Sequence, residues 1–332
     1  MFDRNLFIPF SIQSRPVGCQ FYFCAQGRAC SLAWHSFGLT KMRSGSKIQQ
    51  GVTHKKGRIL RAWLFAPADD AKKAAKALAS GADVVVLDLE DAVLPDQKEA
   101  ARQALAGLLA ERRFSKTRVF IRVNAPGSKD FLRDLTSLNA LNPDGIMVPK
   151  AERPESLEPL GLIGRNVVLL IETALGVERA PDLARALPGL LKRLAFGYLD
   201  FVADIGASWT TTGEALLYAR SRIVLASRIG SLEPPLDGVY PTLDDAGGLK
   251  EECLAAKVLG FGGKMIIHPK HIAAVQEAFA PNQEELDRAR GILEAFEAAT
   301  KSGQGVLVYQ GRFVDRPVVL WAERVLRLLG ES

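Results

Sequence analysis

The sequence is poor in cysteine and has no long apolar run. Only four of its 332 residues are cysteines, and Cys19, Cys24 and Cys30 all fall within residues 1–57. Cys253 is therefore the one cysteine of the remaining chain, which excludes a disulfide scaffold there and favours a reducing, cytoplasmic location. The three early cysteines form no CxxC pair, so we expect no zinc site. No apolar stretch approaches the roughly 18 residues that span a bilayer, so we expect no membrane association.

Several common catalytic motifs are also missing. The sequence has no GxSxG, no GxxxxGK[ST], and no GxGxxG after an expected strand. These absences argue against a serine-hydrolase elbow, a P-loop and a dinucleotide-binding fingerprint. The glycines at 260–264 precede an expected strand instead of following one, so they are a weak candidate for a phosphate cradle.

Acidic residues are nearly absent from residues 1–57. This stretch holds eight Lys or Arg and one acid, so it carries +7, whereas the whole chain carries +6. Residues 58–332 are therefore close to neutral, and the high isoelectric point does not predict nucleic-acid binding by the main body. We interpret residues 1–57 as a basic extension, either disordered or the result of a start assigned too early. A transit peptide or a nucleic-acid-binding arm is the alternative, and a secretory signal is not expected.

Short apolar runs that end in polar or charged residues recur along the sequence. They read VVVLDLED, VFIRVN, GIMVPK, VVLLIET, LAFGYLD and KMIIHPK. Such runs, separated by helix-like segments, are typical of parallel strands buried on both faces. We expect eight strands, at 61–66, 83–89, 118–123, 145–148, 167–171, 193–196, 236–239 and 264–267. Eight strand–helix alternations predict a TIM (β/α)8 barrel. An open doubly wound sheet is the alternative, because the run at 236–239 is weakly marked.

The chain beyond the barrel is too short for a second catalytic domain. We expect the barrel over residues 58–280 and a C-terminal helical and hairpin segment over 281–332, which serves as a lid or in oligomerisation. Its expected elements are a helix at 284–299, a hairpin at 306–314 and a final helix after Pro317. Within the barrel, we expect residues 211–228 to form one helix.

Charged residues follow several expected strands, where a barrel of this kind carries its active site. Glu172 and Asp200 follow the fifth and sixth strands, and two neighbouring carboxylates suit Mg²⁺, with Mn²⁺ as the alternative. Arg122 ends the third strand and can bind a substrate carboxylate through two parallel hydrogen bonds. A salt bridge from Arg122 to Asp88 or Glu90 is the structural alternative.

Three acids crowd the end of the second strand. Asp88, Glu90 and Asp91 lie beside the expected cation, and we place them with the substrate-binding residues. Lys150 ends the fourth strand, where it could form a Schiff base, although an ion pair with Glu172 or Asp88 is the alternative. We expect a structural role for His268.

These motifs together resemble a known family. LFAPAD, VVVLDLEDAVLPDQKEAAR, IRVN, VPKAE, IETALGV, FGYLD and GFGGKMIIHPKHI are similar to the citrate lyase β-subunit-like (CitE-like) acyl-CoA lyases of the HpcH/HpaI aldolase superfamily. The resemblance covers about residues 60 to 330. It implies a magnesium-dependent lyase that cleaves or forms a 3-hydroxyacyl-CoA, such as malyl-CoA or citramalyl-CoA. Cleavage would yield acetyl-CoA and a small 2-oxo acid, and the reverse reaction would join them. The resemblance also implies that the protein forms a homotrimer or hexamer.

The resemblance also assigns roles to single residues. Glu172 and Asp200 match the metal ligands, and Arg122 matches the arginine that binds the substrate carboxylate during catalysis. Arg61 matches an arginine that opens the first strand near the substrate. Asp315 matches a catalytic lid aspartate that enters a neighbouring subunit's site. The alternatives are a malyl-CoA thioesterase on the same scaffold and a citrate lyase β subunit that acts on an acyl-carrier-protein thioester.

Overall fold

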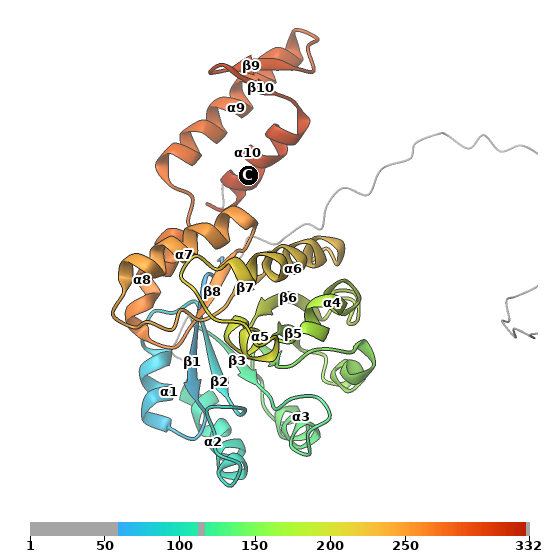
Figure 1. Cartoon of the computed structure of the whole chain (residues 1–332), viewed down its shortest axis with the longest axis vertical. Coiled ribbons are helices and arrows are strands. Elements are labelled where there is room, and N and C mark those ends of the chain that lie inside the picture. The colour runs from blue at the N-terminus through green and yellow to red at the C-terminus, as the bar shows by residue number, and fades with distance from the viewer. Residues whose placement is uncertain (1–58, 112–116, 330–332) are drawn as a thin grey trace, which may run out of the picture. The chain divides into compact units, whose positions relative to one another are not determined.

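Eight parallel strands close into a barrel in the computed structural model, which describes residues 59–111 and 117–329 (Figure 1). The strands are β1 (Ala62–Pro67), β2 (Val84–Asp88), β3 (Arg118–Arg122), β4 (Gly145–Val148), β5 (Asn166–Ile171), β6 (Leu191–Phe196), β7 (Leu236–Asp237) and β8 (Gly263–Ile266). Each strand pairs with the next one in the chain, and β8 pairs with β1. The predicted TIM barrel is therefore confirmed, and the open sheet is excluded.

Helices follow the strands and surround the barrel (Figure 1). The α-helices of this part are α1 (Ala71–Leu78), α2 (Lys98–Glu111), α3 (Phe131–Asn139), α4 (Ala174–Leu183), α5 (Tyr198–Asp204), α6 (Leu217–Ile229), α7 (Ala246–Leu259) and α8 (Ile272–Ala278). The 3-10 helices are η2 (Pro154–Leu162), η3 (Glu214–Leu216) and η4 (Pro269–His271). Local sequence sets several of their ends. Asp70, for example, caps α1 by accepting a hydrogen bond of 2.9 Å from the Lys73 N–H, which satisfies one of the unpaired donors of the first turn.

Side chains of the strands alternate between the barrel interior and the layer beneath the helices, as the period of two requires. The interior holds a buried apolar cluster composed of Leu60, Trp63, Val84, Val86, Phe120, Met147, Val168, Leu170, Ala195, Leu236 and Met265. Asp88, Arg122 and Glu172 each lie two residues beyond a member of this cluster. The same alternation therefore directs their side chains inward, at the carboxyl-terminal end of the barrel.

Four elements differ from the sequence prediction. The seventh strand has two residues instead of four. Gly238 follows it at a position with no room for a β-carbon, which would lie 2.7 Å from Phe196 O. The helix expected from 211 starts later, as η3 and then α6, because Gly213 has a left-handed backbone with φ of 69°. Helices α5 and α8 were not predicted; both have only seven residues, too few for a clear periodic pattern.

The C-terminal segment has a hydrophobic core of its own. It contains α9 (Gln283–Lys301), β9 (Leu307–Tyr309), β10 (Arg312–Val314) and α10 (Arg316–Arg327), with β9 and β10 paired as the predicted hairpin. Asn282 and Glu285 form a capping box at the start of α9. Between the facing helices lie buried apolar side chains that include Leu286, Ile292 and Val319. The domain boundaries at 57 and 280 and the lid role stay predictions, and the predicted basic extension lies outside the described residues.

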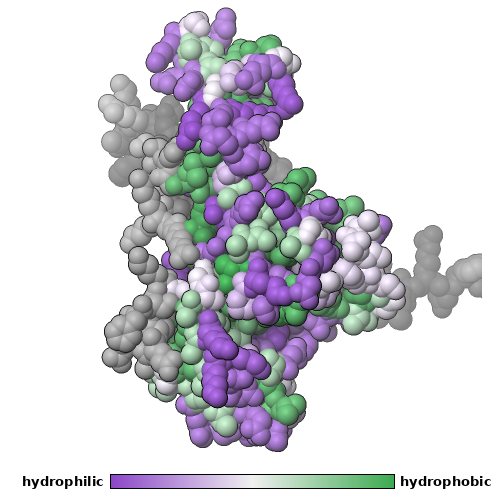
Figure 2. Space-filling model, turned by 90° about the vertical axis from the view of Figure 1, so that its left-hand side faces the viewer, coloured by the Kyte–Doolittle hydropathy of each residue, from purple (hydrophilic) through white to green (hydrophobic). Residues whose placement is uncertain are grey.

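Hydrophilic and hydrophobic residues are interspersed on the face that Figure 2 shows. Among the residues described, we find no helix with the length and apolar character that crossing a membrane requires.

Candidate active site

The register between β2 and β3 pairs Asp88 with Arg122 at the mouth of the barrel. The guanidinium donates two hydrogen bonds to this carboxylate, from Nε at 2.7 Å and from Nη2 at 2.6 Å. Burial opposes the charge on Arg122, but the hydrogen bonds and charge of Asp88 outweigh it, and its pKa lies above the ordinary value. The Phe65 ring lies beneath the guanidinium carbon at 5.0 Å. The salt bridge that the sequence offered as an alternative for Arg122 is therefore present.

Glu90 joins two cations across the barrel mouth. Its carboxylate lies 3.0 Å from Arg122 Nη1 and accepts a hydrogen bond of 2.7 Å from Lys150 Nζ. Burial is the largest influence on Glu90 and raises its pKa in spite of these two cations. Asp91, which is more exposed, lies 3.8 Å from Arg122 and 3.7 Å from Lys150. The acids at the end of β2 are therefore held by Arg122 and Lys150.

Lys150 contributes to the site through its backbone as well as its side chain. Its φ is 49°, a left-handed conformation that is uncommon outside glycine. In this conformation the Lys150 N–H donates a hydrogen bond of 2.7 Å to Glu172 Oε1. The ion pair predicted with Glu172 or Asp88 is corrected by the structure, which gives the ammonium to Glu90. Burial alone would lower the pKa of Lys150, but Glu90 raises it above its usual value, which disfavours the neutral amine that a Schiff base requires.

Glu172 is the most perturbed acid of the site. It is 2% exposed, and burial raises its pKa to about 8, with further contributions from the charges of Glu90 and Asp200. Gly197 makes room for this side chain, since a β-carbon at Gly197 would lie 2.5 Å from Glu172 Oε2. The sequence prediction gave Gly197 no role, although its position directly after an apolar strand is a usable signal.

Asp200 lies in the first turn of α5, four residues beyond the end of β6. Its carboxylate is exposed, and its charge acts on Glu172. The two predicted metal ligands therefore lie at the same end of the barrel and interact electrostatically, one buried and one open to solvent.

The charges of this site do not balance. The seven side chains are Asp88, Glu90, Asp91, Arg122, Lys150, Glu172 and Asp200. Five carboxylates and two cations leave a net charge of −3 when all are ionised. Such an excess, partly buried, favours either a bound cation or protonation of one acid. In the described part of the chain no group of three or more His, Cys, Asp or Glu side chains is arranged to hold a metal. Two carboxylate oxygens with water as the remaining ligands are sufficient for Mg²⁺, so the donor set fits this ion.

Two predicted residues are not part of this cluster. Arg61 directly precedes β1, at the amino-terminal end of the barrel, and its backbone N–H donates to Asp83 at 3.0 Å. The six-residue strand β1 lies between it and the cluster at the other end, and its predicted role in substrate binding stays a prediction. Asp315 is the N-cap of α10, where its side chain accepts from the Val318 N–H. It therefore belongs to the C-terminal segment, and its catalytic role stays a prediction.

The fold and the site define a TIM-barrel enzyme with acidic and cationic side chains gathered at the carboxyl ends of its strands. The family described as HpcH/HpaI aldolase/citrate lyase matches residues 61–269, and the chain belongs to this family. A second family, described as C-C bond lyase of the TIM-barrel fold, matches residues 218–329. The chain is accordingly a lyase.

Named relatives agree with this assignment. The citrate lyase subunit beta-like protein of Mycobacterium tuberculosis is 38% identical over 276 residues, which cover 81% of this chain and 96% of the relative. The mitochondrial citramalyl-CoA lyase of Homo sapiens is 31% identical over 297 residues, which cover 83% and 87% of the two chains.

A solved structure is also similar. The crystal structure of CitE from Mycobacterium tuberculosis in complex with magnesium, acetoacetate and coenzyme A superposes with a TM-score of 0.70. The two chains are 37% identical, and the match covers 82% of this chain and 98% of the other.

Proposed function

We propose that this protein is a magnesium-dependent carbon–carbon lyase acting on a 3-hydroxyacyl-CoA, such as malyl-CoA or citramalyl-CoA. The observation that carries the proposal is the buried Glu172, placed near Asp200 in a site with an excess of negative charge. The similar CitE structure, which contains magnesium and coenzyme A, supports both the ion and the class of thioester.

Glu172 and Asp200 would hold Mg²⁺, with Mn²⁺ as a substitute. When bound, the ion supplies a Lewis acid that favours the developing carbonyl of the 2-oxo acid. Glu172 is prepared for this task because the Lys150 N–H fixes one of its oxygens and Gly197 leaves space beside the other.

Arg122 would orient the carboxylate of the 2-oxo acid. Two of its nitrogens are occupied by Asp88, whereas Nη1 has looser contacts with Glu90 at 3.0 Å and Asp91 at 3.8 Å. We assign Nη1 as the donor to the substrate, with Asp88 fixing the plane of the guanidinium. Glu90 and Asp91 would bind the substrate indirectly, by exchanging their contacts with Arg122 and Lys150.

Cleavage breaks the bond between the hydroxyl-bearing carbon and the carbon next to the thioester. The hydroxyl group loses its proton to a base and becomes the carbonyl of the 2-oxo acid. The electron pair of the broken bond stays on the carbon next to the thioester, which then takes a proton and yields acetyl-CoA. We assign this proton to Asp315 from a second copy of the chain, and closure of the C-terminal segment would exclude competing water. This assignment requires an oligomer, which we predict to be a homotrimer or hexamer. We also predict a cytoplasmic location, from the low cysteine content.

The decisive experiment measures the products from malyl-, citramalyl- and citryl-CoA by mass, with Mg²⁺ or with chelator. We expect acetyl-CoA and a 2-oxo acid with Mg²⁺ only, and a loss of at least about 10³-fold in kcat for Glu172→Gln with the fold retained. Binding of Mn²⁺, followed by paramagnetic resonance, should weaken in the same variant.

Other products would identify the alternatives. Free malate and CoA would show a thioesterase. Activity confined to thioesters of an acyl-carrier protein would show a citrate lyase β subunit. Full activity of Glu172→Gln in the presence of chelator would contradict the metal assignment.

A further inference from the structure

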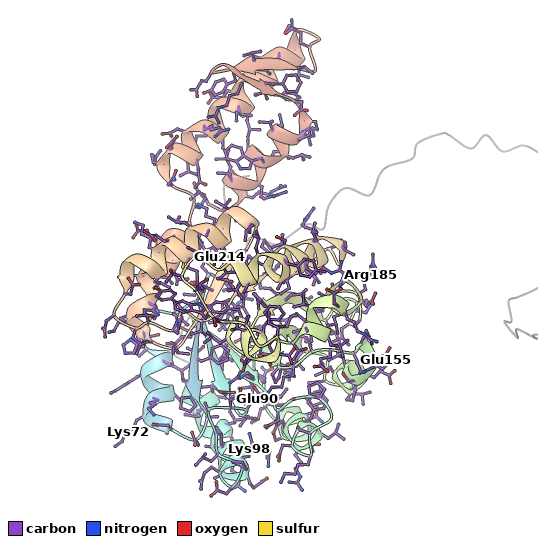
Figure 3. All side chains as sticks on the ribbon, viewed as in Figure 1. Lys72, Glu90, Lys98, Glu155, Arg185 and Glu214 are labelled. Atoms are coloured by element: carbon purple, nitrogen blue, oxygen red, sulfur yellow. The ribbon has the colours of Figure 1, made fainter. Side chains whose placement is uncertain are left out.

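All three protons of the Lys98 ammonium form hydrogen bonds, and two of them go to the backbone of the loop that carries Glu90. Lys98 is the first residue of α2, and its ammonium donates to Leu89 O at 2.8 Å, to Glu90 O at 2.9 Å and to Asn124 Oδ1 at 2.6 Å. An ammonium has three protons, so each proton has one acceptor. Figure 3 labels Lys98 on α2 and Glu90 at the end of β2.

Asn124 extends this arrangement to α3. It is buried at the end of β3, and its side-chain amide donates to Leu89 O at 3.1 Å and to Asp134 Oδ2 at 2.7 Å. Arg102, one turn beyond Lys98 on α2, donates to the other oxygen of Asp134 at 2.9 Å. Asp134 is completely buried, so these donors, and not water, stabilise its negative charge. The ends of β2 and β3 are thus joined to α2 and α3 by one continuous polar network.

This network accounts for a part of the motif DLEDAVLPDQKEAAR to which the proposed reaction gives no role. The first three acids of the motif, Asp88, Glu90 and Asp91, belong to the site. Its lysine and its final arginine, Lys98 and Arg102, belong to the network instead. Lys98 donates a hydrogen bond to the backbone of Glu90. Arg102 binds Asp134, which accepts from the N–H of Asn124 just beyond the strand that ends at Arg122.

We infer that Lys98 is a positioning residue that fixes the loop Leu89–Asp91, so that the Glu90 carboxylate stays between Arg122 and Lys150. Removal of the ammonium takes the charge-assisted donor from both carbonyls. Leu89 O then keeps only the Asn124 amide at 3.1 Å, and Glu90 O keeps only the Val93 N–H at 3.2 Å, so the loop is held less firmly. The Glu90 side chain moves with its backbone. Arg122 Nη1 then loses the neighbour that aligns it for an incoming carboxylate.

Hydrogen exchange of backbone amides tests this inference without reference to the substrate. In Lys98→Met, which keeps the side-chain length and removes the charge, we expect the amides of Glu90 and Ala92 to exchange about tenfold faster, as suits the loss of charge-assisted hydrogen bonds. Lys98→Arg keeps the charge but not the geometry of the three hydrogen bonds. Its exchange rates at these amides should lie between those of wild type and Lys98→Met. Lys250→Met is the matched control, because Lys250 is an exposed lysine on α7.

Two results would overturn the inference. One is unchanged exchange at Glu90 and Ala92 in Lys98→Met. The other is an equal increase throughout the barrel, which would show that Lys98 merely stabilises the fold. Should Lys98→Met fail to fold, the same comparison is made between Lys98→Arg and wild type.

A binding measurement connects the loop to function, and this arm rests on the proposed function. With Mg²⁺ present, the Kd for pyruvate measured by calorimetry should rise about tenfold in Lys98→Met. The change should largely disappear in a Glu90→Gln background, because Lys98 acts through Glu90. Additive effects of the two substitutions would contradict the inference. Absence of 2-oxo acid binding by the wild type would count against the proposed function, and the exchange experiment would still decide the role of Lys98.

Discussion

At the scale of the residue, the environment of Glu172 decides what the site can bind. A carboxyl group in water has lost its proton well below neutral pH. Burial together with the charges of Glu90 and Asp200 keeps the proton on Glu172 up to a pH of about 8. The same negative charges that hold the proton also attract a divalent cation, so proton and metal compete for one side chain.

This competition predicts opposite effects of pH with and without metal. The raised pKa of Glu172 means that the folded, metal-free protein binds a proton that the unfolded chain has released. This contribution to stability is fully present below the unfolded value near 4.5 and is lost as pH rises towards about 8. Stabilisation by Mg²⁺ should instead increase over this interval, because the ion displaces the proton.

Thermal unfolding with Mg²⁺ and with chelator measures both effects. The difference in Tm between the two conditions should grow from about pH 6 to about pH 8 in wild type, and should be small and constant in Glu172→Gln. An equal difference at both pH values in wild type would contradict the prediction.

At the scale of the element, a buried charged cluster ties α5 to its neighbours. Lys264 of β8 is completely buried and donates to Asp237 of β7 at 2.7 Å and to Glu252 of α7. Tyr198, the first residue of α5, donates to Glu252 at 3.0 Å. Arg220 of α6 donates two hydrogen bonds of 3.0 Å to Asp237. The cluster is balanced, with two acids and two bases, and it supports the helix that carries the proposed metal ligand of this region.

Removing one charge from this cluster should be costly. Lys264→Met leaves Asp237 and Glu252 buried without their shared cation, and we expect a loss of about 3–5 kcal/mol in the free energy of unfolding. Lys250→Met, the exposed control on α7, should change it by less than about 0.5 kcal/mol. Urea denaturation followed by circular dichroism measures both values. A loss below about 1 kcal/mol for Lys264→Met would show that the cluster is not needed for stability.

At the scale of the whole molecule, the barrel carries the cluster of acidic and cationic side chains, and we propose that the C-terminal segment contributes Asp315. The two contributions are predicted to meet between copies of the chain. The Asp315→Asn and Glu172→Gln proteins should each have a strongly reduced kcat, because each lacks one part of every site. Mixed oligomers of the two should recover activity where an intact Glu172 meets an intact Asp315.

The recovered activity has an expected size. Random mixing of equal amounts in a ring gives about a quarter of the sites both intact residues, so about a quarter of wild-type turnover should return after dissociation and reassembly. Asp315→Asn alone should reduce kcat more than it changes KM. Without recovery on mixing, a role of Asp315 in a neighbouring site is refuted.

Most of the fold could be predicted because the patterns that identify its strands lie within short stretches of sequence. Continuous apolar runs with a terminal polar residue identify buried parallel strands wherever they are long enough, and the eight runs led to the closed barrel. The pattern failed at β7, whose two residues owe their pairing to the strands on either side. No helix was expected at α5 either, so the prediction did not place Asp200 on a helix.

The candidate site was predictable only as a set of residues. Asp88, Glu90, Arg122, Lys150, Glu172 and Asp200 could be placed at one end of the barrel because parallel strands deliver their carboxyl ends together. A salt bridge of Arg122 with Asp88 or Glu90 could be offered as an alternative, but the pairing of Lys150 with Glu90 could not, because these two residues are 60 positions apart and meet only when the barrel closes. The place of Arg61 was inferred from resemblance, and strand direction assigns it to the other end.

The sequence by itself determined the order of the barrel strands, the inward alternation of side chains, and therefore the end of the barrel at which charge collects. These properties depend on period and chain direction, which are fixed by covalent structure. Tertiary structure alone decided that Lys150 pairs with Glu90, that Gly197 makes room for Glu172, and that Lys98 holds the loop beneath Glu90. Those contacts join residues 8 to 60 positions apart, and their distances follow from barrel closure and register.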